Sequence, residues 1–140
     1  MPIRPELRHL YPENWRELSA FVRFSRANGR CERCGRPHQH QLRCLPDGRW
    51  YDEDNATWRD TRNRHARCPD LLEAGAFRLT RVVLAAAHLN HRPGDNRLRN
   101  LRALCQRCHL EHDRAYHQAQ RWRTLRSRWA IGDLFLGRYH

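Results

Sequence analysis

Two pairs of cysteines in the sequence have the spacing of metal ligands. Cys31 and Cys34 form one C-x-x-C pair, and Cys105 and Cys108 form a second. Two intervening residues let both thiolates of a pair reach one tetrahedral ion from a tight turn, and Gly35 adds backbone freedom directly after the first pair. In a reducing compartment such cysteines act as metal ligands more often than as disulfides. We therefore predict a structural Zn²⁺ site of four cysteines.

Two further cysteines, Cys44 and Cys68, lie between these pairs. Together with His65 they could form a second zinc site. Alternatively, they are small apolar residues of the core, a common environment for a free cysteine. The sequence leaves both interpretations open.

The stretch 88–113 begins with a histidine and continues through a loop to Asn100, the second cysteine pair and His109. In this order it resembles the HNH endonucleases, also called ββα-metal nucleases. The helix and first cysteine pair expected over 12–35 also look like the N-terminal half of zinc-containing members. Residues 36–80 lie outside the resemblance.

The resemblance implies a role for each matching residue. His88 matches the general base, Asn100 matches the asparagine that pins the loop and orients the base, and His109 matches a helix-borne ligand of a catalytic divalent metal. Asp113 lies one helical turn after His109, so the two side chains project from one helix face. Asp113 is therefore the candidate second ligand, and His112 competes for that place.

Hydrolysis of a phosphodiester needs an activated water, in-line attack and stabilisation of the leaving oxygen. A neutral imidazole near pH 7 suits deprotonation of water, and a hard divalent ion stabilises the leaving oxygen. A closed site of four cysteines has no open position for this work. We therefore expect two metals, a structural Zn²⁺ and a catalytic Mg²⁺ or Mn²⁺.

One position departs from the family pattern. Many members carry an aspartate or histidine ligand just before the base, where this chain has Ala87. Either His91, Asn90 or Asp113 supplies the ligand, or the site is weakened. His91 could also be the base, with His88 as the ligand. A weakened site would make the chain a non-catalytic zinc-ribbon DNA-binding module, which is the alternative function.

The charge of the chain favours a polyanionic partner. Its formal net charge is +12, and all its Lys and Arg positions are arginine. Codon bias explains arginine over lysine but not the net charge. We predict duplex DNA as the partner, with phosphate contacts from the arginines that flank the candidate base: Arg92, Arg97, Arg99 and Arg102. RNA is a third possibility, which the small number of aromatic residues argues against.

The elements that must position these residues indicate a small α+β fold. We expect a ββα-metal core with a zinc ribbon of four cysteines, an N-terminal helix with Trp15, Leu18 and Val22 on one face, and a long C-terminal helix ending near Trp129. A strand is expected in the first half of 79–87, and a hairpin around 46–48. We expect one domain over 1–140. Its segments would be a helix with the first cysteine pair (the first zinc knuckle) over 12–35, an insert over 36–80, and the ββα-metal core with the second cysteine pair over 81–129.

Nothing in the sequence predicts a membrane segment. The first five residues lead into no apolar segment of a signal peptide, and the longest apolar run, 82–87, is too short to span a bilayer. We therefore expect an intracellular, cytoplasmic protein without a membrane partner. The resemblance suggests a phage or mobile-element setting and a metal-dependent endonuclease for duplex DNA. As a monomer it would nick one strand, and as a homodimer it would cut both.

Overall fold

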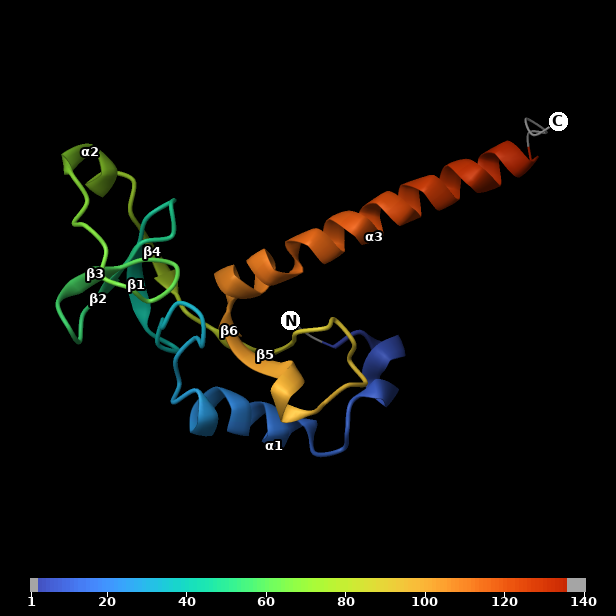
Figure 1. The fold of residues 1–140 in the computed structure, drawn as a ribbon, viewed down its shortest axis with the longest axis horizontal. Helices are drawn as coiled ribbons and strands as arrows, with labels where there is room; N and C mark the ends of the chain where they lie inside the picture. Colours follow the sequence, from blue (N-terminus) through green and yellow to red (C-terminus); the bar gives the residue numbers. More distant parts are fainter. Residues whose placement is uncertain (1–2, 136–140) are drawn as a thin grey trace. The chain divides into compact units, whose positions relative to one another are not determined.

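The computed structural model describes residues 3–135, and their side chains up to residue 130. The chain forms two compact units, Met1–His109 and Leu110–His140, which are described separately. None of the helices in the described range has the length and hydropathy that crossing a bilayer requires. The fold is a small α+β structure with a long C-terminal helix (Figure 1).

The described part of the first unit contains short helices and six short strands. In chain order these elements are a 3-10 helix (Pro5–Leu10), α1 (Trp15–Ala20), a π-helical turn (Phe21–Arg26), β1 (Gln41–Cys44), β2 (Trp50–Asp52), β3 (Thr57–Arg59), α2 (Leu71–Ala74), β4 (Arg78–Arg81), β5 (Leu84–His88), a 3-10 turn (Leu98–Asn100), β6 (Leu101–Cys105) and the start of α3 (Gln106–Phe135). The strands form two sheets, one of four strands in the order β3-β2-β1-β4 and one of β5 with β6.

The N-terminal helical segment packs on the hairpin of β5 and β6. In Figure 1, α1 lies below these two strands. The expected apolar face is confirmed, because Trp15, Leu18 and the fully buried Val22 pack with Leu101 and Ala103 of β6. The segment does not stay α-helical to its end, since α1 is followed directly by a π-helical turn. It stops where the sequence predicted, at two residues with left-handed backbone, Asn28 (φ 54°) and Gly29 (φ 69°).

The insert 36–80 supplies most of the four-stranded sheet. The expected hairpin is confirmed, because Cys44 of β1 pairs with Trp50 of β2 and the Leu45 amide donates to the Arg49 carbonyl at 2.8 Å. Gly48 closes the turn with φ 97°, a conformation that glycine adopts without steric cost. Trp50 is fully buried in a core that also contains the four predicted zinc ligands.

The apolar stretch 79–87 forms parts of two strands. The sequence predicted a strand in its first half, which corresponds to β4, but the second half is also a strand, β5, in the other sheet. The chain leaves the first sheet at Val82, whose amide and carbonyl bond to His40 and Gln39 at 2.9 and 2.8 Å. The Val83 amide then donates to the Gln106 side chain at 3.0 Å, so these long-range bonds explain the break.

The second unit is the remainder of α3, which continues to Phe135, beyond the predicted end near Trp129. Its described surface carries many charged side chains, such as Arg114, which is paired to Glu111 at 2.8 Å one turn away, and also the exposed Trp122 and Trp129. The Arg126 guanidinium lies over the Trp122 ring at 5.0 Å. These are local contacts of the kind that stabilise an isolated helix by a few tenths of a kcal/mol each, roughly.

Glu32 joins the first cysteine knuckle to β6, because its carboxylate accepts from the Ala103 amide at 2.6 Å and from Arg26 at 2.8 Å. Ala103 is fully buried, so Glu32→Ala leaves a buried donor without a partner. We expect a loss of about 1–3 kcal/mol in the free energy of unfolding, measured by urea denaturation. The matched control is Glu13→Ala, which removes an exposed glutamate and should change stability by less than about 0.5 kcal/mol. Equal stabilities would contradict this role.

Candidate functional site

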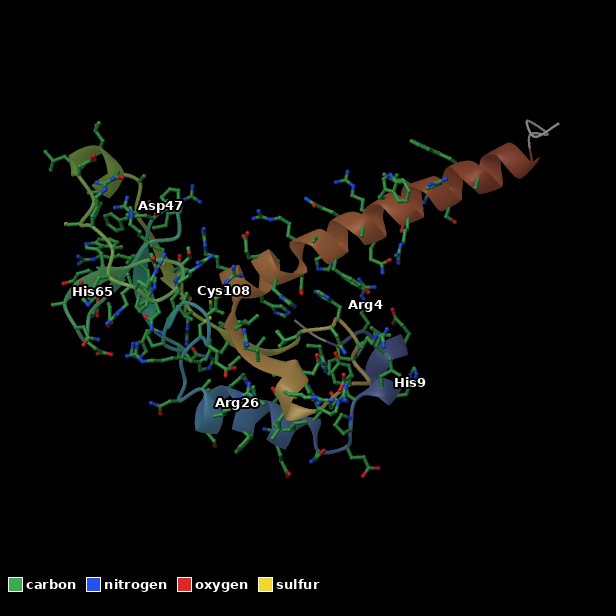
Figure 2. All side chains as sticks on the ribbon, viewed as in Figure 1. Arg4, His9, Arg26, Asp47, His65 and Cys108 are labelled. Atoms are coloured by element: carbon green, nitrogen blue, oxygen red, sulfur yellow. The ribbon has the colours of Figure 1, made fainter. Side chains whose placement is uncertain are left out.

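The four predicted zinc ligands come together in the core. Cys31, Cys34, Cys105 and Cys108 are all buried, and their sulfur atoms lie within 4.8 Å of one another. The Sγ atoms of Cys34 and Cys105 are 3.6 Å apart, and sulfur ligands at about 2.3 Å from a tetrahedral zinc would be about 3.8 Å apart. The donor set and its spacing therefore fit one zinc ion, and Figure 2 places Cys108 at the start of α3.

Short backbone bonds shape the first knuckle. The Gly35 amide donates to the Cys31 carbonyl at 2.9 Å, and the Cys31 amide donates to the Arg36 carbonyl at 3.0 Å. Gly35 has φ 79°, which is the left-handed conformation expected after such a pair. The buried Trp50 indole donates to the Cys34 carbonyl at 3.1 Å, so the knuckle is anchored to β2 as well.

The thiols of this cluster shift one another's pKa values. Hydrogen bonds from Cys105, then from Cys108 and Cys34, hold the pKa of Cys31 well below its ordinary value. Hydrogen bonding with Cys108 is the largest influence on Cys105 and lowers its pKa to about 7. Hydrogen bonding with Cys105 raises the pKa values of Cys34 and Cys108 instead. Without a metal, two thiols therefore lose their protons more readily than the other two, and binding of zinc requires all four to become thiolates.

The alternative second zinc site is not assembled among the described residues. Cys44 is buried in the core, where its thiol donates to the Leu42 carbonyl, whereas Cys68 is exposed. His65 contacts the Thr57 hydroxyl at 3.2 Å instead. Cys44 is therefore a small apolar residue of the core, which is the alternative that the sequence left open.

His88 ends β5 and is held by three neighbours. Its ring stacks on Trp15 with centroids 5.3 Å apart, and the Tyr11 ring meets it edge-on at 5.7 Å. Its Nε2 lies 2.9 Å from the side-chain oxygen of Asn96. The amide nitrogen of Asn96 donates to the carbonyls of Pro93 and Leu10 at 3.1 and 3.4 Å.

These carbonyls fix the orientation of Asn96 and thereby the tautomer of His88. A carbonyl only accepts, so the Asn96 nitrogen faces both carbonyls and its oxygen faces the imidazole. Nε2 of neutral His88 must then carry the hydrogen, which leaves Nδ1 as the nitrogen that can take a proton. Sequence reasoning missed Asn96, Trp15 and Tyr11 in this role, because nothing in the local pattern links the N-terminal segment to the loop.

Asn100 holds the loop between β5 and β6. It is 8% exposed, and its side chain accepts from the Asn90 amide at 3.1 Å and donates to the Asp95 carbonyl at 2.8 Å. The same nitrogen reaches the Asn90 side-chain oxygen at 2.9 Å, and the Leu89 amide donates to the Asn100 carbonyl at 2.8 Å. These bonds tie both ends of the loop to one residue.

His88 and His109 line one cavity of about 470 Å³. His109 lies in the first turn of α3, directly after the second knuckle, and the Trp15 and Tyr11 rings form part of the wall. Ala87 is 1% exposed and belongs to the apolar core, so it offers no ligand atom. An imidazole can accept a proton or bind a metal ion, so two of them on one cavity can serve both purposes.

The remaining predicted ligands, His91, His112 and Asp113, belong to different elements. His91 is in the loop with a left-handed backbone (φ 58°), and its amide donates to the His88 carbonyl at 3.2 Å. His112 and Asp113 lie on α3, in the second unit, where an Asp113 oxygen is 3.9 Å from Nε2 of His117. His117 was not predicted, although it follows Asp113 at the i, i+4 helical spacing.

The four predicted phosphate-contacting arginines are all exposed: Arg92, Arg97, Arg99 and Arg102. Arg97 differs from the others because its guanidinium binds both carboxylate oxygens of Asp95 at 2.7 Å. Hydrogen bonding from Arg97 holds the pKa of Asp95 well below its usual range, so the pair stays ionised. Arg97 therefore braces the loop, whereas the other three present their charge to solvent.

Comparison with known proteins provides no relative for this chain. No protein-family model, no curated protein and no solved structure matches it.

Replacing one cysteine of the cluster should abolish zinc binding. A metal assay of the purified full chain should find about one zinc per chain in the wild type and none in Cys34→Ser, which should also lose cooperative thermal unfolding, because site formation and folding are coupled. The matched control is Cys68→Ser, which removes an exposed thiol outside the cluster and should keep its zinc. Equal zinc contents in the two variants would contradict the site.

Proposed function

We propose that this chain is a metal-dependent DNA endonuclease of the HNH type, which hydrolyses phosphodiester bonds in duplex DNA. The observation that carries the proposal is the cavity where His88, at the end of β5, meets His109, in the first turn of α3. The order strand, pinned loop, strand and helix supports the same reading, with Asn100 as the pin.

In the proposed reaction His88 takes a proton from the attacking water through Nδ1. The Asn96 oxygen at 2.9 Å holds the hydrogen on Nε2, and stacking on Trp15 limits rotation of the ring. A base held in one orientation and one tautomer acts without reorganisation during the reaction. Trp15 and Asn96 are positioning residues in this scheme.

A catalytic Mg²⁺ or Mn²⁺ would be held by His109 and Asp113, which are one helical turn apart on α3. Imidazole and carboxylate ligands suit such an ion, and when bound it would stabilise the charge on the leaving oxygen. The zinc cluster has a structural role, because four thiolates complete its tetrahedral coordination.

DNA binding is supported by the net charge of +12 and by the exposed Arg92, Arg99 and Arg102 near the His88 loop. Contacts of this kind go to phosphates and provide affinity without reading bases. With one site per chain, a monomer would nick one strand and a homodimer would cut both. A cytoplasmic, phage or mobile-element setting belongs to the same proposal and rests on the sequence resemblance alone.

A second candidate function is a non-catalytic zinc-ribbon DNA-binding module. Ala87 favours it, because this buried methyl replaces a ligand of the family pattern. This candidate requires DNA binding without cleavage under every divalent metal.

The nuclease proposal is tested with supercoiled plasmid and Mg²⁺ or Mn²⁺. We expect conversion to open circles that needs the added metal, with the rate reduced about 10²–10⁴-fold in His88→Ala, because general-base catalysis contributes this much. His40→Ala removes an exposed histidine of the insert and serves as the matched control with an unchanged rate. Salt-sensitive DNA binding without cleavage would replace the nuclease by the binding module, and loss of activity in His91→Ala but not in His88→Ala would move the base to His91.

The positioning role of Asn96 has its own test. Asn96→Ala should lower the cleavage rate about tenfold or more while DNA affinity stays unchanged, because the imidazole loses its fixed tautomer. Nitrogen NMR of His88 should show the Nε2–H form in the wild type and a mixture of both tautomers in the variant. Asn14→Ala, which removes an exposed asparagine without a capping bond, is the control. An unchanged tautomer in Asn96→Ala would refute the role.

A further inference from the structure

A second cavity, of about 620 Å³, lies against the four-stranded sheet of the first unit. Its wall includes Cys44 of β1, Thr80 of β4 and three arginines, Arg36, Arg78 and Arg107. No acidic residue lines it. None of these residues belongs to the cavity of His88, so the proposed nuclease leaves this cavity without a role.

Arg36 is the buried member of the three arginines. It is 4% exposed, and within the described residues its side chain forms one hydrogen bond, from Nη2 to the Gly48 carbonyl at 3.0 Å, while its Nε has no partner there. No residue in the described range forms an ion pair with it. Arginine stays charged at every physiological pH, and a buried charge is costly unless a counter-charge is near. A zinc ion held by four thiolates would carry a net charge of −2, which is less than the charge of the three guanidinium groups together.

Gly48 brings a second guanidinium to the same place. A Cβ built on Gly48 would lie 2.8 Å from Nη2 of Arg107, so this side chain rests against the residue that Arg36 binds. Arg78 is paired with Cys44 in the β1–β4 ladder and so reaches the cavity from the sheet. Neither Arg78 nor Arg107 has a side-chain hydrogen bond or ion pair within the part of the chain that is described.

The nearest acids are already engaged elsewhere. Arg49 binds Asp47 through Nε and Glu73 through Nη2, both at 2.7 Å. Asp47, labelled in Figure 2, follows the wall residue Pro46 in the β1–β2 turn. Hydrogen bonds from Asp70 and the two arginines Arg67 and Arg49 lower the pKa of Glu73 to about 2, so it stays bound as a carboxylate. The three cavity arginines therefore have no carboxylate partner in the part of the chain that the structure describes.

We propose that this cavity binds a phosphate group between Arg36, Arg78 and Arg107. Guanidinium groups bind phosphate oxygens through paired, charge-assisted hydrogen bonds, and the Thr80 hydroxyl provides a further donor. The cavity has room for an ester on the phosphate, as in a nucleic-acid backbone or a small phosphate ester. This inference goes beyond the proposed nuclease and stands whether or not the chain cuts DNA.

The test uses the full chain in chloride buffer, titrated with inorganic phosphate by calorimetry. We expect saturable binding whose Kd rises about tenfold or more in Arg107→Gln and in Arg78→Gln, since each loses a charged hydrogen bond. Both side chains lie outside the buried core, so these variants should fold. The matched control is Arg43→Gln, which removes the same charge from β1. Arg43 directly precedes Cys44, and its side chain is exposed whereas that of Cys44 is buried, so the two point to opposite faces of the strand. Phosphate binding that is absent, or that Arg43→Gln weakens equally, would overturn the proposal.

A second arm identifies the source of the phosphate. Binding of a labelled DNA duplex is measured without added divalent metal at several salt concentrations. If the phosphate belongs to DNA, Arg107→Gln should weaken binding and lower the slope of log K against log salt by about 1, while Arg43→Gln changes the slope less. If Arg107→Gln loses binding of inorganic phosphate but binds the DNA duplex as the wild type does, the site takes a free phosphate or a small ester. Cleavage is not measured in either arm, so failure of the nuclease proposal does not affect the result.

Discussion

The structure depends on the four thiols that join two distant parts of the chain. Cys34 and Cys105 are 71 positions apart in sequence, yet their sulfur atoms lie 3.6 Å apart in the core. One pair follows the N-terminal helical segment, and the other spans the junction of β6 and α3. A metal ion held by all four would restrict the unfolded chain and stabilise a fold with a small apolar core.

This constraint reaches the candidate catalytic residues through the β5–β6 hairpin. Leu84 pairs with Cys105 at the metal end of the hairpin, and His88 pairs with Leu101 at the other end. His109 follows Cys108 directly in the first turn of α3 and lines the same cavity as His88. The cysteine cluster therefore fixes both the strand that presents one histidine and the start of the helix that presents the other.

Spacing in the sequence predicted the features that depend on local geometry. The two cysteine pairs, the Trp15 helix face and the glycine turn at Gly48 each follow from a short repeat or a backbone preference. The break at Val82 could not be predicted in this way, because it depends on bonds to Gln39 and His40, which are distant in sequence. The contact of Asn96 with His88 and the gathering of arginines around the second cavity likewise depend on tertiary packing.

Cobalt substitution tests most directly whether one tetrahedral metal ion organises this fold. The metal-free chain is titrated with Co²⁺ while visible absorption and near-UV circular dichroism are followed together. We predict intense absorption of tetrahedral cobalt bound to thiolates, saturating at about one equivalent, with ordering of the buried aromatic residues at the same point. Weak absorption typical of six-coordinate cobalt, or aromatic signals that do not respond to the metal, would contradict the claim.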